Sequence, residues 1–173
     1  MEKKNRLGFL IFVTLSCALF FYSGIASGID EAPSDFTLSY GWGATHAEWG
    51  RYLLEIHPQG GVDLYIGSRR YHDKNGPGPE NWAAHKQFIF AKSELSEIFK
   101  EIKKNRFYSL KDSYRNEKIM DGSSLYLSVL ADGKAKSVTV MNTTVKGVGE
   151  IIEKIFKVLD AKDPNWRNAL NEY

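Results

Sequence analysis

The chain has 173 residues, of which 43% are apolar, 13% aromatic and 25% charged, with 23 Lys and Arg residues against 21 Asp and Glu residues. This length provides for one ordinary domain, and the aromatic content argues against disorder. The balanced charge excludes a strongly basic nucleic-acid binder, and one cysteine cannot supply the ligand set of a zinc or iron–sulfur site. Composition therefore assigns no function beyond that of a small domain.

The N-terminus carries the features of an export signal. Three basic residues within the first six precede an uncharged, apolar stretch over 7–26, which predicts a signal peptide or a signal anchor over 1–26. Small residues before the polar stretch favour cleavage after Ala26. Two alternatives stay open. One is an uncleaved anchor, because about 20 apolar residues can span a bilayer, and the other is a lipoprotein acylated on Cys17.

Removal of this leader changes the charge of the chain. The leader takes with it three basic residues, one acidic residue and Cys17, so the remaining chain has a formal net charge of zero. No electrostatic argument for nucleic acid or anionic lipid then remains. We expect an exported domain, periplasmic or extracellular, that contacts a membrane only through an uncleaved leader or a lipidated Cys17.

The first half of the domain is predicted to consist of strands joined by turns. Alternating apolar and polar residues predict strands over 35–40, 51–57, 62–71 and 84–90. The turn Pro58-Gln59-Gly60-Gly61 predicts a hairpin that places Leu54 and Leu64 on a shared face. The segments 41–50 and 71–81 are rich in glycine, and we predict a loop in each of them.

An amphipathic helix is predicted to follow. Ser93 is its expected N-cap, and lysines near Arg106 complement the helix dipole at the other end. Its apolar stripe consists of Leu95, Ile98, Phe99 and Ile102. This spacing at i, i+3, i+4 and i+7 predicts a helix that packs one face against a sheet.

The second half is predicted to be a hairpin and another helix. Strands over 125–131 and 134–141 meet at the turn Asp132-Gly133, and Thr144 is the expected cap of the helix. Residues 161–173 are predicted to form a tail. The order of elements indicates a single α+β domain over 35–160, with an antiparallel sheet built from hairpins and two helices packed on one face.

The four histidines are candidates for metal binding or acid–base chemistry: His46, His57, His72 and His85. Their spacing of 11, 15 and 13 residues matches no metal-ligand motif. The simpler interpretation is that they are exposed on strand ends and loops. The alternative is a site of His46, Glu48 and His72, formed if the two loops converge.

Motifs for other chemistry are also missing. The sequence has no Gly-x-Ser-x-Gly elbow, no cysteine after the leader and no phosphate-binding loop before a helix. We therefore predict no catalytic residue, no metal and no cofactor, and we do not expect an enzyme. The function that stays open as an alternative is a small metal-dependent or hydrolytic enzyme that uses the loop histidines.

Aromatic and basic residues gather in and beside the two glycine-rich segments, taken as 41–50 and 67–82. The candidate partner-binding residues are Trp42, Trp49, Arg69, Arg70, Tyr71 and His72. Flat rings beside polar donors suit a peptide, glycan or protein surface. The alternative is that rings such as Trp49 and Trp82 pack over the sheet edge. Trp42 lies between two glycines and is predicted to be at least partly exposed.

A set of turn and core residues between 35 and 159 carries a resemblance. It comprises Gly50 to Ile56, Gly61 to Tyr65, Ser93 to Leu95, Phe107 to Leu110, Asp121-Gly122, and Asp132 to Lys134 before Val138. In these residues the chain resembles uncharacterised bacterial exported α+β domains. More faintly, its two helices, the segment 107–110 and the final hairpin resemble emfourin, a small inhibitor of thermolysin-like metallopeptidases. The longer loops before Ser93 depart from that family.

These observations together favour one function. We expect a non-catalytic exported domain of the cell envelope that binds a protein or peptide partner through the segments 41–50 and 67–82. The resemblance to emfourin implies peptidase inhibition as a specific form of this function.

Overall fold

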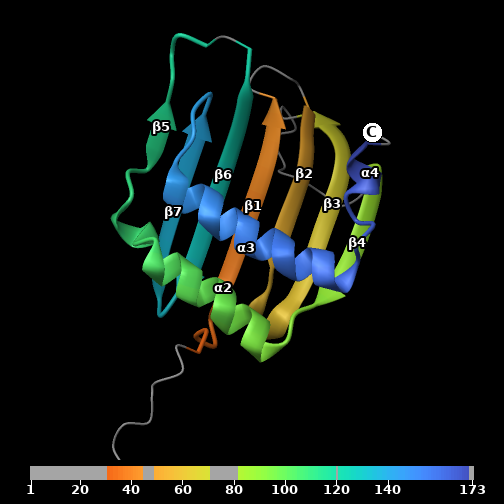
Figure 1. Cartoon of the computed structure of the whole chain (residues 1–173), viewed down its shortest axis with the longest axis vertical. Helices are drawn as coiled ribbons and strands as arrows, with labels where there is room; N and C mark the ends of the chain where they lie inside the picture. The colour runs from red at the N-terminus through yellow and green to blue at the C-terminus, as the bar shows by residue number, and fades with distance from the viewer. Residues whose placement is uncertain (1–30, 45–48, 71–81, 120, 172–173) are drawn as a thin grey trace, which may run out of the picture. The chain divides into compact units, whose positions relative to one another are not determined.

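A computed structural model of the chain describes residues 31–44, 49–70, 82–119 and 121–171 (Figure 1). These residues fall in one structural unit that begins at Glu31. The predicted leader over 1–26, including Cys17, lies outside the described residues. Within the described ranges, no helix has the length and apolar character needed to cross a membrane.

The unit consists of a sheet, two long helices and short helical turns. The strands are β1 (Thr37–Ala44), β2 (Trp49–Ile56), β3 (Gly61–Arg70), β4 (Ala84–Ile89), β5 (Ser113–Arg115), β6 (Ser123–Ala131) and β7 (Lys134–Met141). The helices are α2 (Lys92–Lys104), α3 (Lys146–Lys162) and the short α4 (Asn168–Asn171). Two 3₁₀ turns, η1 (Pro58–Gly60) and η3 (Phe107–Ser109), complete the described elements.

The strands form one sheet in the order β4-β3-β2-β1-β6-β7-β5. Neighbouring strands are antiparallel except β5 and β7, which are parallel. Both α2 and α3 cross the same face of this sheet (Figure 1). The predicted fold class, an α+β domain with a hairpin-built antiparallel sheet and two helices on one face, is confirmed.

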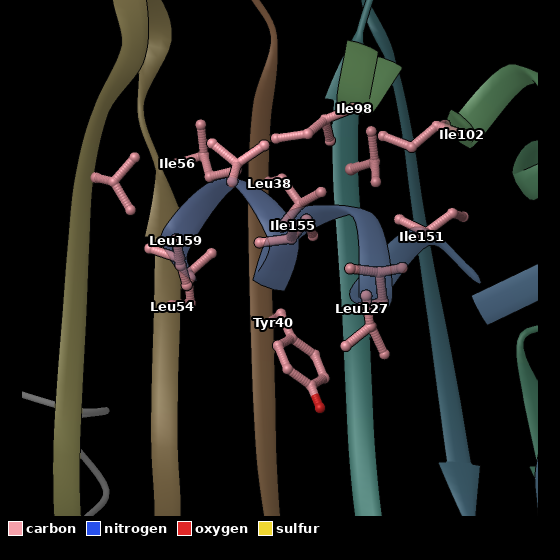
Figure 2. Close-up of a cluster of buried hydrophobic side chains, with 14 of the residues drawn as sticks. Leu38, Tyr40, Leu54, Ile56, Ile98, Ile102, Leu127, Ile151, Ile155 and Leu159 are labelled. Carbon is pink, nitrogen blue, oxygen red and sulfur yellow. The ribbon is translucent and has the colours of Figure 1, made fainter. Parts of the chain in front are cut away.

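The core lies between this face and the two helices. Every second residue of the central strands points into it, as the two-residue period of a strand requires, and Leu38, Leu54 and Leu127 are almost completely buried (Figure 2). The predicted apolar stripe of Leu95, Ile98, Phe99 and Ile102 is buried in this cluster, together with residues of β6, β7 and α3: Val129, Val138, Ile152 and Ile155. Phe156 of α3 is partly buried against the same cluster.

The predicted loop over 41–50 is wrong at both of its ends, because β1 continues through Gly41, Trp42 and Gly43 to Ala44 and β2 begins at Trp49. Residues 45–48 lie outside the described residues. Gly41 lies within a strand and does not form a turn. A Cβ atom on Gly41 would lie 2.1 Å from Cε1 of Tyr126 on β6. The glycine therefore makes room for a neighbouring ring within an ordinary strand.

Both helices begin away from their predicted caps. Helix α2 starts at Lys92, one residue before Ser93, and the Glu94 carboxylate accepts a hydrogen bond of 2.6 Å from the backbone N–H of Ala91. Helix α3 starts at Lys146, with Val145 and not Thr144 at the N-cap position. In α2 a carboxylate in the first turn thus replaces the hydroxyl cap that the sequence suggested.

The C-terminal segment is part of the domain, contrary to the predicted tail over 161–173. Trp166 is completely buried, and its Nε1 donates a hydrogen bond of 2.8 Å to Oδ1 of Asp160. Its ring centroid lies 5.2 Å from that of Phe156. The guanidinium of Arg167 lies over both rings and pairs with the Asp160 carboxylate. The large apolar area of the Trp166 ring, which the tail prediction did not take into account, holds this segment in place.

Candidate functional site

One face of the sheet is free of helices and strands within the described residues. Because side chains alternate across a strand, the residues between the core positions all point to this second face, which we call the open face. In strand order from β4 to β7 it carries His85, Gln87, Ile89, Asp63, Tyr65, Leu53, Glu55, Ser39, Tyr126, Ser128, Ser137 and Thr139. The open face thus combines aromatic, imidazole, hydroxyl, amide and carboxylate groups with two aliphatic side chains, of which Leu53 is buried and Ile89 is exposed.

A carboxylate with three hydrogen-bond donors lies at one side of the open face. Asp63 Oδ1 lies 2.7 Å from Nε2 of His85 and accepts a bond of 2.9 Å from Nε2 of Gln87. Asp63 Oδ2 lies 2.6 Å from Nε2 of His57. We call these four residues the Asp63 cluster. The carboxylate is largely buried among its partners, whereas both imidazoles are partly exposed.

The local fold explains why these residues meet. Residues Pro58–Gly60 turn the chain back with positive φ at Gln59 (70°) and Gly60 (94°), and the backbone N–H of His57 donates to Gly61 O at 2.8 Å. Strand β3 then runs back along β2, and β4 pairs with β3 so that Gln87 lies opposite Asp63. The cluster is therefore assembled by the register of three adjacent strands.

The hydrogen bonds determine the charge state of Asp63. Partial burial raises the pKa of its carboxyl, but the bonds from Gln87, His85 and His57 outweigh this effect and hold the pKa below its usual value. The carboxylate is consequently ionised at neutral pH. Burial, together with the charges of Asp63 and Glu55, in turn raises the pKa of Tyr65.

Aromatic rings extend the cluster along the sheet. The ring of Tyr65 stacks on the imidazole of His85, with centroids 4.5 Å apart and planes 8° apart. On β4's side, Trp82 is half-buried, and its ring lies 6.0 Å from Tyr65. Trp82 thus packs at the sheet edge, as the alternative interpretation of the aromatic residues has it. The stacked Tyr65 ring and the hydrogen bond to Asp63 together fix the orientation of His85.

The Asp63 cluster fixes the ring orientation of both histidines. Each imidazole directs Nε2 to the carboxylate, so its other ring nitrogen, Nδ1, does not take part in that bond. The two imidazoles contact different oxygens of Asp63, and within the described residues no three His, Cys, Asp or Glu side chains are grouped so as to hold a metal ion. What the cluster provides is a set of hydrogen-bonding groups in fixed positions on a flat surface.

Sequence reasoning missed this cluster. The spacing of the histidines predicts separate, exposed residues on strand ends and loops, whereas the structure brings His57 and His85 to one carboxylate. The predicted hairpin contained the signal, because placing Leu54 opposite Leu64 puts Glu55, His57 and Asp63 together on the other face. The alternative site of His46, Glu48 and His72 lies outside the described residues.

The six predicted partner-binding residues are divided by the structure. Trp42 is a strand residue on the helix side, half-buried, with its ring stacked on Tyr52 at a centroid distance of 5.7 Å. Trp49 of β2 pairs in register with Arg70 of β3, and the neighbouring Gly50 pairs with Arg69. The backbones of these residues lie at the same end of β1, β2 and β3 as Trp42 (Figure 1).

The remaining two, Tyr71 and His72, lie outside the described residues. The candidate site therefore consists of the open face with its Asp63 cluster, and next to it the strand ends that carry Trp49, Arg69 and Arg70. No known protein-family model matches the chain, and comparison with curated proteins found no similar sequence.

Proposed function

We propose that the chain is a non-catalytic exported domain that binds a protein or peptide partner on its open face, with peptidase inhibition as a specific form of this activity. The observation that carries the proposal is the Asp63 cluster, in which three side chains hold one carboxylate on a face that no described helix or strand covers. The network fixes the positions of hydrogen-bonding groups whose imidazoles are still partly exposed to solvent, which suits the recognition of a partner.

The chemistry of the open face suits a protein partner. Interfaces combine aromatic side chains with hydrogen-bonding groups, and the open face has Tyr65 and Tyr126 beside the carboxylates and hydroxyls of its central row. Tyr126 is 38% exposed. Side chains already held in place lose little conformational entropy on binding, which favours affinity.

The strand ends beside this face extend the proposed contact area. Trp49, Arg69 and Arg70 were predicted to bind a partner, and the pairing of β2 with β3 places their backbones together. We retain them as peripheral contacts of the same interface. We do not include Trp42 among these contacts, because it lies on the helix side of the sheet and packs on Tyr52.

A photo-crosslinking experiment tests the proposal. A crosslinking amino acid replaces Ser128, on the open face of β6, or Lys157, whose side chain is 69% exposed on α3. The chain is incubated with envelope extract of its source cell, and adducts are identified by mass spectrometry. A specific adduct at position 128, suppressed by excess wild-type chain, is the expected result, with none at position 157.

A competitor variant makes the test specific to the open face. Ser39→Arg places a long cationic side chain in the row between Glu55 and Ser128, so an excess of this variant should not suppress the adduct. Equal adducts at positions 128 and 157, or suppression by Ser39→Arg as strong as by the wild type, would show that the partner does not use the open face.

A further inference from the structure

Strand β4 is the outermost strand at one side of the sheet (Figure 1). The backbone N–H of Phe90 donates to Gly60 O at 2.8 Å, and the register continues this pairing to Phe88 with Val62 and Lys86 with Leu64. Since hydrogen-bonded and non-bonded pairs alternate in an antiparallel ladder, the residues between them direct their N–H and C=O groups away from β3. These residues are His85, Gln87 and Ile89.

The two edges of the sheet differ in their protection against pairing. Strand β5, at the opposite edge, has only three residues, and charged side chains flank it at Lys111, Asp112 and Glu117. Short length and charge are the usual protection of an edge. Strand β4 has six residues, contains no proline, and pairs with β3 without a register shift.

Neither Lys86 nor Ile89 protects the edge of β4 against pairing with another strand. Lys86 is the charged residue of β4 that could do so, but its Nζ is held by Oδ2 of Asp163 at 2.8 Å on the helix side. On the open face Ile89 is 77% exposed, the highest value among the large apolar residues described. A regular edge strand that ends in an exposed isoleucine is suited to receive another strand.

We infer that β4 pairs with β4 of a second copy of this chain, antiparallel and about a twofold axis at Gln87. In this register Gln87 lies opposite its own equivalent, and His85 lies opposite Ile89. All three outward-directed residues then exchange N–H···O bonds with one another, and each Ile89 side chain packs beside the partner's His85 ring. The two sheets become one, with both open faces on the same side.

The symmetry of the outward-directed residues decides between this register and its two neighbours. Residues opposite each other in an antiparallel pair lie on the same face, so a twofold axis passes between two copies of one residue. An axis at Lys86 would leave Ile89 outside the strand pairing, and an axis at Phe88 would leave His85 outside it. An axis at Gln87 pairs all three outward-directed residues with one another. This symmetry of the β4 edge about Gln87 is the reason that we assign the edge to a second copy.

Cysteine substitution tests the pairing at single-residue resolution. Residues opposite each other in a hydrogen-bonded pair have Cα atoms about 5.5 Å apart, within the range of a disulfide. Gln87→Cys should therefore crosslink two copies under mild oxidation. In Ile89→Cys, the matched control, the two cysteines would be separated by four residues along the strands, about 14 Å, and should not crosslink. Cys17 is the same in both variants.

A second pair of variants addresses the backbone bonds. Gln87→Pro removes an outward-directed N–H without removing a bond to β3, whereas Gln87→Ala loses the same side-chain contact with Asp63 and keeps the N–H. Sedimentation equilibrium of the purified protein, expressed from the whole sequence, should show a dimer for wild type and Gln87→Ala and a monomer for Gln87→Pro. If Gln87→Pro does not fold, Ile89→Lys, which adds a charge opposite His85, should give the monomer.

Several results would overturn the inference. The first is a wild-type chain that stays monomeric over a roughly 100-fold range of concentrations up to about 0.1 mM, the range in which weak interfaces form. The second is equal crosslinking of both cysteine variants. The third is a monomer that adds an extended peptide to β4 instead of a second copy. The outcome is separable from the proposed function, since adducts at Ser128 report on the open face and do not require a dimer.

Discussion

Asp63 and Glu55 lie directly opposite each other on β3 and β2, with both carboxylates on the open face. Asp63 has three hydrogen-bond donors, whereas Glu55 has no hydrogen-bond or ion-pair partner among the described side chains. Like charges in this position destabilise a sheet. The Asp63 carboxylate is therefore stabilised by its donors and repelled by the Glu55 carboxylate, at the centre of the proposed interface.

Substitution of these two residues should have opposite effects on stability. Asp63→Ala leaves three donors without their acceptor and should lower the free energy of unfolding by about 2 kcal/mol. Glu55→Gln removes the repulsion and keeps the shape of the side chain, so it should raise the free energy of unfolding by about 0.5 kcal/mol. Urea denaturation at pH 7 measures both. Destabilisation by Glu55→Gln would show that Glu55 has a stabilising role that the structure does not reveal.

The contribution of Asp63 should depend on pH in a defined direction. Its folded pKa lies below the ordinary value of 3.8, so the folded state favours the charged form. The resulting stabilisation is complete above the unfolded pKa and is lost as the pH falls through the lower folded pKa. The difference in unfolding free energy between wild type and Asp63→Asn should therefore decrease between pH 5 and about pH 2. A constant difference would exclude this linkage.

Two glycines with positive φ should respond differently to alanine. At Gly60 (φ 94°) a Cβ atom would lie 2.2 Å from the backbone oxygen of Phe90, whereas at Gly133 (φ 67°) nothing lies within 4 Å. Gly133→Ala costs only the strain of a left-handed residue, about 1 kcal/mol. In Gly60→Ala the new methyl group must also push away the backbone of Phe90, which follows β4. This variant should therefore lower the free energy of unfolding by clearly more than Gly133→Ala. Thermal unfolding of the two variants checks the order.

The C-terminal segment should be essential for stability. Trp166→Ala removes a completely buried ring and should cost about 3 to 5 kcal/mol. Arg167→Ala, which removes the guanidinium over Trp166 and Phe156, is the milder control, at about 1 kcal/mol. Urea denaturation that shows no loss for Trp166→Ala would mean that the segment packs elsewhere in solution.

Trp42 offers a test of the earlier binding expectation. Because its ring is half-buried on Tyr52, Trp42→Ala should lower the free energy of unfolding by about 2 kcal/mol, while Trp42→Phe should retain most of the packing. Crosslinking at position 128 should survive in Trp42→Phe. Complete loss of partner binding in a fully folded Trp42→Phe would restore Trp42 to the interface.

Local features were predictable from the sequence, because their signals lie within a few residues of each other. The stripe of α2 and the turn Asp132-Gly133, with positive φ at both residues, follow from spacing and from residue type. The continuation of β1 through Gly41 was not predictable in this way. The ring for which Gly41 makes room belongs to Tyr126, which lies far along the chain, and glycine next to tryptophan is equally typical of a loop.

The candidate site was predictable only in part for the same reason. His57 and Asp63 belong to one hairpin, whose predicted register already placed them on one face. His85 joins them through β4, which follows the long segment 71–81, and no spacing rule reports which strand such a segment returns to. The short strand β5 was missed as well, because three residues show no period and its pairing with β7 is parallel.

The central position of β1 has a consequence for how the chain acquires its structure. Its two neighbours in the sheet are β2, the next strand in the chain, and β6. Just before β1, the carboxylate of Asp35 accepts hydrogen bonds from the backbone N–H groups of Asp132, 97 residues away, and Gly133, in the turn that follows β6. The strands β1 to β4 can form from local hairpins, as can β6 with β7. Their union closes a long loop and is entropically slow. Until it happens, each half exposes a bare central strand, so the nascent protein is most vulnerable to aggregation in the middle of its own sheet.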